Sequence, residues 1–319
     1  MSEPRPAIDT DAVKARYALS AVVGRWVKLR KAGHELVGLC PFHGENSPSF
    51  RVNDSKGLYH CFGCGASGDI IDFVRAAESV DFIGAVRWLT GDEVLTPIDP
   101  TWRANQARIE RAERSAAILA AQAQWHEARS IVGTPAEKYL HSRGITGPMP
   151  PSIRFRRVPL WRDKTTGKDG RPFPALIAAC QDVRGKVVGV QRVYLTEDGQ
   201  KARMANPKLS LGQVRGGAVR LGPVARTIIL CEGPEDGLTL RQRFPDASVW
   251  VALGTGNLPF VELADAVETV TIAGDNNAAG RAAVAAGAEA FAARGREVRA
   301  IYPDPAFVDW NDELMGVRA

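Results

Sequence analysis

The pattern of apolar and polar positions changes several times along this chain of 319 residues. Residues 25–43 and 50–62 alternate short β-rich stretches around turns, the first at Gly33 and the second at Asn53–Gly57, which predicts two hairpins. Ahead of them, Asp9 and Thr10 can cap a helix over residues 11–23. Residues 68–93 then predict two amphipathic helices, whose apolar faces would be Ile70, Ile71, Phe73 and Val74, and Phe82, Ile83, Val86, Trp88 and Leu89.

Beyond residue 102 the pattern changes again. Residues 103–132 are rich in Ala, Arg, Gln and Glu and contain no Gly or Pro, which predicts a long helix. Strands are expected over residues 174–182 and 186–195. In the last hundred residues strands alternate with helices, which predicts a parallel sheet covered by helices. The expected order is strand 227–231, a helix from Asp236, strand 248–253, a polar helix, strand 269–273, helix 278–294, strand 297–302 and a closing helix.

These elements predict an α+β multidomain chain, with a break at the proline-containing segment 96–100. Four parts are expected: a zinc-ribbon domain over residues 1–98, a helical linker over 99–134, a small, basic, mixed α/β subdomain over 135–225, and a C-terminal α/β domain with a parallel sheet over 226–319.

Charge is distributed unevenly over these parts. Residues 137–226 carry 18 Lys and Arg against 6 Asp and Glu, whereas residues 227–319 carry 7 against 14. A basic block beside an acidic one suits an enzyme that gathers polyanions next to metal-binding carboxylates. No long apolar run and no signal-peptide core occurs, so we expect no membrane association and a cytoplasmic location. Cys180 and Cys231 lie in apolar runs and are predicted to be buried, unpaired thiols.

Three of the five cysteines form a metal-binding pattern with one histidine. Cys40 and His43 are separated by two residues, as are Cys61 and Cys64, and each pair lies at a turn of a predicted hairpin. Two such turns can surround one tetrahedral zinc ion. Because four protein ligands leave no open position, we expect a structural zinc site and not a catalytic one.

Three acidic clusters follow predicted strands of the C-terminal part. They are Glu232-Gly233-Pro234-Glu235-Asp236, Asp275-Asn276-Asn277 and Asp309-Trp310-Asn311-Asp312. Residues just past the carboxyl ends of parallel strands meet at one crevice. Several carboxylates there would repel one another unless cations lie between them, so the grouping predicts Mg²⁺ or Mn²⁺.

The stretch 22–74, which contains the Cys-His-Cys-Cys pattern, resembles the zinc ribbon of bacterial (DnaG-type) DNA primases. In that family the exposed face of the ribbon contacts the template strand. The resemblance therefore implies DNA contacts at Arg30, Lys31, Arg51 and Lys56, and base stacking on Tyr59 or Phe62.

Residues 226–314 resemble the Toprim domain of primases, topoisomerases and some nucleases. The resemblance implies an acid/base or metal-linked role for Glu232 and metal binding by Asp275 and Asp309, with Asn277 and Asn311 at the remaining motif positions. The Asp-x-Asn form of the third motif is similar to primases of phages and plasmids, which suggests a mobile genetic element. One departure concerns Asn277, because the family usually has Asp there and the site loses one negative charge.

The basic segment resembles the small subdomain that precedes Toprim in primases. On that resemblance Arg192, Lys201 and Lys208 are expected to contact nucleotide phosphates or the template, with Lys164 and Lys168 as weaker candidates.

Taken together, these resemblances predict a DNA primase that makes short RNA primers on single-stranded DNA from ribonucleoside triphosphates. No G-x-x-x-x-G-K-[ST] motif occurs, so the replicative helicase is expected to be a separate protein. Two alternatives stay open. One is a nuclease of the Toprim family, and the other is a primase-like protein that binds single-stranded DNA but whose catalysis is weakened by Asn277.

Overall fold

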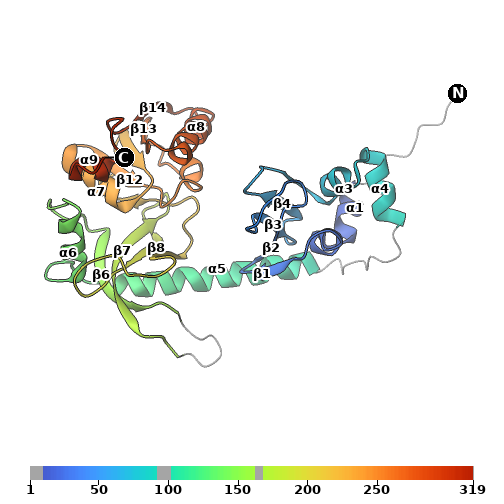
Figure 1. The fold of residues 1–319 in the computed structure, drawn as a ribbon, viewed down its shortest axis with the longest axis horizontal. Helices are drawn as coiled ribbons and strands as arrows, with labels where there is room; N and C mark the ends of the chain where they lie inside the picture. The colour runs from blue at the N-terminus through green and yellow to red at the C-terminus, as the bar shows by residue number, and fades with distance from the viewer. Residues whose placement is uncertain (1–9, 92–101, 162–167, 319) are drawn as a thin grey trace. The chain divides into compact units, whose positions relative to one another are not determined.

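The computed structural model describes residues 10–91, 102–161 and 168–318 (Figure 1). Its internal contacts divide the chain into two compact units, residues 1–113 and 114–319. Helix α5, Trp102–His126, contributes to both units. The long helix predicted from residue 103 is confirmed in type, but it ends at His126 and not at residue 132.

The N-terminal unit contains a five-stranded antiparallel sheet in which each strand pairs with the next one along the chain. Both predicted hairpins are confirmed, and Gly33 takes the positive φ of 67° that the first turn requires. The elements are α1 Thr10–Arg16, α2 Leu19–Val23, β1 Arg30–Ala32, β2 Glu35–Gly38, β3 Phe50–Asn53, β4 Leu58–Cys61, β5 Ser67–Gly68, α3 Ile70–Glu78 and α4 Phe82–Gly91.

Two expectations for this unit were wrong in detail. The helix expected over residues 11–23 is divided into α1 and α2, because Ala18 has an extended backbone and Tyr17 beside it is buried in the core. Its expected cap Asp9 lies outside the described residues. On α4, Phe82 and Ile83 are exposed, and the buried face consists of Ala85, Val86 and Leu89.

The C-terminal unit contains two sheets. The first is antiparallel, in the order β6-β7-β8-β9, and the second has the order β10-β12-β11-β13-β14 with every neighbouring pair parallel except β10 and β12. The strands are β6 Ile153–Pro159, β7 Pro172–Gln181, β8 Val187–Tyr194, β9 Lys208–Gly212, β10 Val219–Arg220, β11 Thr227–Cys231, β12 Ser248–Val251, β13 Thr269–Ala273 and β14 Glu297–Ile301. The helices are α6 Pro135–Ser142, α7 Pro234–Arg243, α8 Ala278–Ala292 and α9 Trp310–Met315.

The predicted parallel sheet is therefore confirmed, with α7 packed beside α9 (Figure 1). The polar helix expected after β12 is wrong: only a short 3₁₀ turn, Leu258–Phe260, forms there. Leu253 and Gly254 have φ angles of 64° and 137°, which a right-handed helix cannot contain.

Residues of both sheets of the C-terminal unit, such as Leu176 on β7 and Ile229 on β11, belong to one buried hydrophobic cluster. Leu140 and Ile145 from the basic segment, Leu238 on α7 and Trp310 on α9 belong to the same buried cluster. Cys180 and Cys231 are buried and unpaired, as expected. None of the helices that the structure describes has the length and apolar character to cross a membrane.

Candidate functional site

Four side chains of the N-terminal unit converge at the predicted zinc site. The ligand atoms of Cys40, His43, Cys61 and Cys64 all lie within 4.8 Å of one another. Zinc–sulfur bonds of about 2.3 Å at tetrahedral angles separate two sulfurs by about 3.8 Å. The Sγ atoms of Cys40 and Cys64 are 3.8 Å apart, so the arrangement fits one zinc ion.

Neighbouring groups favour the metal-binding thiolate form of Cys61. Burial alone raises the pKa of the Cys61 thiol, but hydrogen bonds from Ser49 Oγ and from the Cys64 and Gly63 backbone outweigh it and lower the pKa to about 6. His43 presents Nδ1 to Cys61, while its Nε2 lies 3.3 Å from a Glu45 carboxylate oxygen. A carboxylate behind a histidine fixes the orientation of its ring. The motif spacing gave no indication of this role for Glu45.

The expected DNA-contacting residues of the ribbon lie in different environments. Arg30 and Arg51 lie in one row across the sheet, since both pair with Val37. Lys31 lies in the neighbouring row, and Lys56 is exposed in the β3–β4 turn.

Of the two aromatic side chains expected to stack on bases, Tyr59 is buried among other rings and is not available. Phe62, by contrast, is 69% exposed, with the Arg51 guanidinium 5.7 Å from its ring centre. The template contacts stay predictions, with Phe62 as the remaining stacking candidate.

The acidic residues of the C-terminal unit gather at the carboxyl ends of the parallel strands. Glu232 directly follows β11, Asp275 lies two residues after β13, and Asp309 caps α9 by accepting from the Asp312 N–H at 2.7 Å. We call Glu232, Asp236, Asp275 and Asp309 the acidic cluster.

Mutual repulsion shows in the pKa values of this cluster. Burial and the charges of Glu232 and Asp309 raise the pKa of Asp275 to about 6. Asp236, in the first turn of α7, has a pKa well above its usual value because of burial and the charges of Asp309 and Asp275. Such a group is where cations are expected to bind. Asp236 was part of the first motif but was not among the predicted ligands.

Asn276, between the two expected ligands of the second motif, joins the motifs together. Its backbone N–H donates to the Val308 carbonyl, and Arg281 donates to its side-chain oxygen. Its amide nitrogen donates to the carbonyls of Pro303, Asp304 and Phe307. These bonds attach the loop before α9 to the end of β13 and so bring Asp309 beside Asp275.

The two asparagines predicted as metal ligands already have structural contacts. Asn277 is exposed and caps α8, because its Oδ1 accepts from the Gly280 N–H at 2.8 Å. Asn311 is fully buried, and its amide nitrogen donates to the Arg143 carbonyl and to Thr239 Oγ1. An amide oxygen has two lone pairs, so a metal-binding role for either residue stays a prediction.

Two of the predicted phosphate-binding lysines meet at a carboxylate beside the acidic cluster. Lys201 Nζ lies 3.2 Å from Glu235 Oε1, and Lys208 Nζ lies 3.1 Å from Oε2. The Tyr139 hydroxyl donates to Oε1 at 2.6 Å. Burial would raise the pKa of Glu235, but the charges of Lys208 and Lys201 lower it to about 2, so this carboxylate is ionised. Burial raises the pKa of Glu232 and of Asp275, and the charge of Lys208 offsets part of that rise at both carboxyl groups.

The other basic candidates lie elsewhere. Arg192 on β8 donates to the carbonyls of Leu209 and Ser210 on β9, so part of its hydrogen-bonding capacity joins two strands. Lys168 is exposed, and Lys164 lies outside the described residues. Nucleotide or template contacts at these positions stay predictions.

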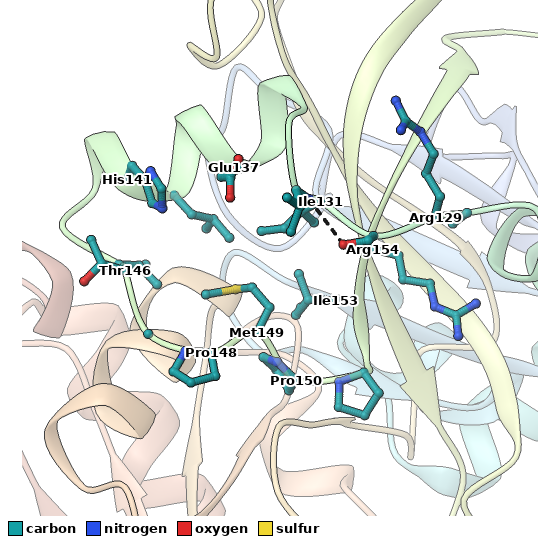
Figure 2. A pocket seen from close by; sticks show the side chains of 17 residues that line it. Arg129, Ile131, Glu137, His141, Thr146, Pro148, Met149, Pro150, Ile153 and Arg154 are labelled. Carbon is teal, nitrogen blue, oxygen red and sulfur yellow. Dashed lines mark hydrogen bonds between the residues drawn. The ribbon is translucent and has the colours of Figure 1, made fainter.

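A separate pocket of about 540 Å³ lies beside α6 (Figure 2). Glu137 and His141 of α6 line one side, and Ile131, Met149 and Ile153 contribute apolar surface. The pocket shares no residue with the acidic cluster.

Comparison with known families matches three successive parts of the chain. Residues 6–98 match the family described as CHC2 zinc finger, and residues 227–317 match the Toprim domain. Between them, residues 115–221 match a domain of unknown function, DUF7146. The chain is thus a protein with an N-terminal CHC2 zinc ribbon and a C-terminal Toprim domain.

This chain is related to the bacterial DNA primases. It is 36% identical to the DNA primase of Lactococcus lactis over 149 residues, which cover 44% of this chain and 23% of the relative. It is 41% identical to the DNA primase of Mycobacterium bovis over 142 residues, 43% of this chain and 22% of the relative. The similarity thus spans less than a quarter of the length of these relatives.

Among solved structures, the zinc-binding and RNA polymerase domains of the Aquifex aeolicus primase match with a TM-score of 0.44 and 20% identity. That match covers 98% of this chain and 83% of the other, but a likeness this low supports nothing by itself.

Proposed function

We propose that this protein is a DNA primase that makes short RNA primers on single-stranded DNA from ribonucleoside triphosphates. The observation that carries the proposal is the acidic cluster at the ends of β11 and β13, with the ammonium group of Lys208 beside it. A zinc ribbon at the front of the same chain favours template-directed synthesis over a Toprim nuclease, since such nucleases rarely carry one.

Each part of the site has a role in the proposed reaction. Glu232, Asp236, Asp275 and Asp309 would hold divalent cations, Mg²⁺ or Mn²⁺, because hard cations prefer carboxylate oxygens. When bound, these cations would supply charge that activates the attacking hydroxyl and stabilises the leaving pyrophosphate. Lys201 and Lys208 would bind nucleotide phosphates. Cys40, His43, Cys61 and Cys64 would bind the structural zinc ion.

Metal binding at the acidic cluster should depend on pH around the pKa of Asp275, about 6. Below that pH the carboxyl holds a proton that Mg²⁺ must displace, so affinity should fall about tenfold per pH unit. The raised pKa also means that ionisation of Asp275 destabilises the metal-free fold as the pH rises from about 4 to 6. A fixed millimolar concentration of Mg²⁺ should therefore raise the Tm more at pH 7.5 than at pH 5.

Asp275→Asn is the matched control for this pH dependence. It removes the titrating group and keeps the shape of the side chain, so the difference between the two pH values should shrink. Equal Mg²⁺ stabilisation of the wild-type protein at both pH values would contradict the account.

Asn277→Asp tests the position where this chain departs from its family. Aspartate is as good a helix cap as asparagine, so α8 should be unaffected. If the residue faces the metals, the added charge should lower the Mg²⁺ concentration for half-maximal synthesis by a few-fold. Identical Mg²⁺ titration curves for the two proteins would show that this side chain only caps α8.

A single incubation separates the candidate functions. The protein is mixed with single-stranded DNA, four ribonucleoside triphosphates and Mg²⁺ or Mn²⁺. New oligoribonucleotides support the proposal, and shortened DNA would indicate a nuclease instead. A gel shift without either product would indicate a DNA-binding protein with weakened catalysis. A primase would work in the cytoplasm, where template and nucleotides are found, together with a helicase that has not been identified.

A further inference from the structure

The carboxylate of Glu235 lies at the centre of a network that the proposed reaction does not yet use. It is 5% exposed, in the first turn of α7 and next to Asp236 of the acidic cluster. It accepts hydrogen bonds from Tyr139 on α6 and Lys208 on β9, and it forms an ion pair with Lys201 in the loop before β9. A buried carboxylate is costly unless it is paired, so its presence here needs an explanation.

The partners of Glu235 leave a net positive charge facing outward. One carboxylate and two ammonium groups sum to a charge of +1, and the side chains of Lys201 and Lys208 remain 38% and 36% exposed. Each ammonium group has three N–H donors, and the donors that do not face Glu235 can bind a further anion.

The position of Lys208 identifies the anion. Its ammonium group lies 3.1 Å from Glu235, the residue next to Asp236 of the acidic cluster, and its charge acts on Glu232 and Asp275 at the ends of β11 and β13. An anion bound by the lysines would thus lie next to the cations held by the acidic cluster. The triphosphate of a nucleotide needs this combination, because it carries several negative charges over a short distance.

The ammonium groups of Lys201 and Lys208 would repel each other and separate if the Glu235 carboxylate did not lie between them. We propose that Glu235 is a positioning residue, anchored by Tyr139, that holds Lys201 and Lys208 where they bind the triphosphate of the incoming nucleotide. This inference rests on the proposed function. It also gives a role to the contact between the basic segment, which matches a domain of unknown function, and the Toprim domain.

Glu235→Gln makes the sharpest test, because it keeps the size of the side chain. Oε1 accepts a hydrogen bond from Tyr139 and forms the ion pair with Lys201, whereas Oε2 accepts from Lys208. The amide oxygen of glutamine should therefore stay with the first two partners, and its NH₂ group should face Lys208 and displace it. Glu235→Gln should then act like Lys208→Ala, and the double variant should be no worse than either single variant.

The measurement is binding of ATP and of AMP to the full chain with Mg²⁺ and without template, by calorimetry. Glu235→Gln should raise the Kd for ATP about tenfold, as expected for one lost charge-assisted contact, and should reduce the preference for ATP over AMP. In primer synthesis the KM for nucleotides should rise more than kcat falls. Lys138→Ala is the matched control, since Lys138 is exposed on α6 next to Tyr139, and it should leave both values unchanged.

The outcomes distinguish failure of the role proposed for Glu235 from failure of the proposed primase function. If the wild-type protein binds no ATP, the proposed function and this inference both fall. If the wild-type protein binds ATP and Glu235→Gln binds it equally well, with only a lower Tm, Glu235 is structural and the inference alone is overturned. Should Glu235→Gln fail to fold, Tyr139→Phe removes only the anchoring hydroxyl and should still weaken ATP binding by a few-fold. Unchanged ATP binding in that variant would likewise overturn the inference.

Discussion

Asp275→Asn should reduce primer synthesis by roughly 10²–10³-fold or more, the loss typical when one charge-stabilising group leaves a preorganised site. The same substitution should leave the Tm of the metal-free protein unchanged or higher. Its carboxylate is held against the charges of Glu232 and Asp309, so removing it relieves repulsion. Activity and stability should therefore change in opposite directions, which an unfolding mutation cannot produce.

Synthesis assays and thermal unfolding of the same preparations test this prediction. Asp304→Asn is a suitable control, because Asp304 is exposed on the loop that leads to α9. It should retain activity close to that of the wild-type protein. Loss of activity with a clear fall in Tm in Asp275→Asn would mean that Asp275 supports the fold and not the reaction.

Cys61→Ser should unfold the N-terminal unit and leave the C-terminal unit intact. A structural zinc ion contributes about 10 kcal/mol in small zinc domains, which equals or exceeds the whole stability of many domains. The N-terminal unit depends on the ion in particular because the four zinc ligands link the β2–β3 loop to the end of β4. Elemental analysis should fall from one zinc ion per chain toward zero, and limited proteolysis should then cleave within residues 10–91.

Cys180→Ala provides the matched control, because Cys180 lies on β7 in the C-terminal unit and is not one of the zinc ligands. It should retain one zinc ion and an intact N-terminal unit. A Cys61→Ser protein that loses its metal yet resists protease over residues 10–91 would show that the unit folds without zinc.

Short-range patterns explain why the zinc site and part of the acidic cluster could be predicted from the sequence. The spacing of Cys40, His43, Cys61 and Cys64 is a local property, and the hairpins that carry it have clear turn residues. Glu232 and Asp275 lie at the ends of strands whose apolar runs are easily recognised, and parallel pairing then brings those ends together.

Contacts between distant segments could not be predicted in the same way. Glu235 and Asp236 belong to the first acidic cluster of the sequence, but their burial and the contacts of Glu235 with Tyr139 and Lys208 appear only in the structure. Asn276 looked like a spacer between two ligands, although its bonds attach the loop before α9. Periodicity placed Phe82 on the apolar face of α4, but it is the first residue of the helix and is exposed, whereas Ala85, Val86 and Leu89 are buried.

The most direct test of the account asks whether the products are RNA copies of the template. The wild-type protein is incubated with single-stranded DNA of defined sequence, labelled ribonucleoside triphosphates and Mg²⁺, and the products are sequenced. The account predicts short oligoribonucleotides complementary to the template, whose sequence changes when the template is changed, and none from Asp275→Asn. Products independent of the template, or no oligoribonucleotides from a folded protein that contains zinc, would contradict it.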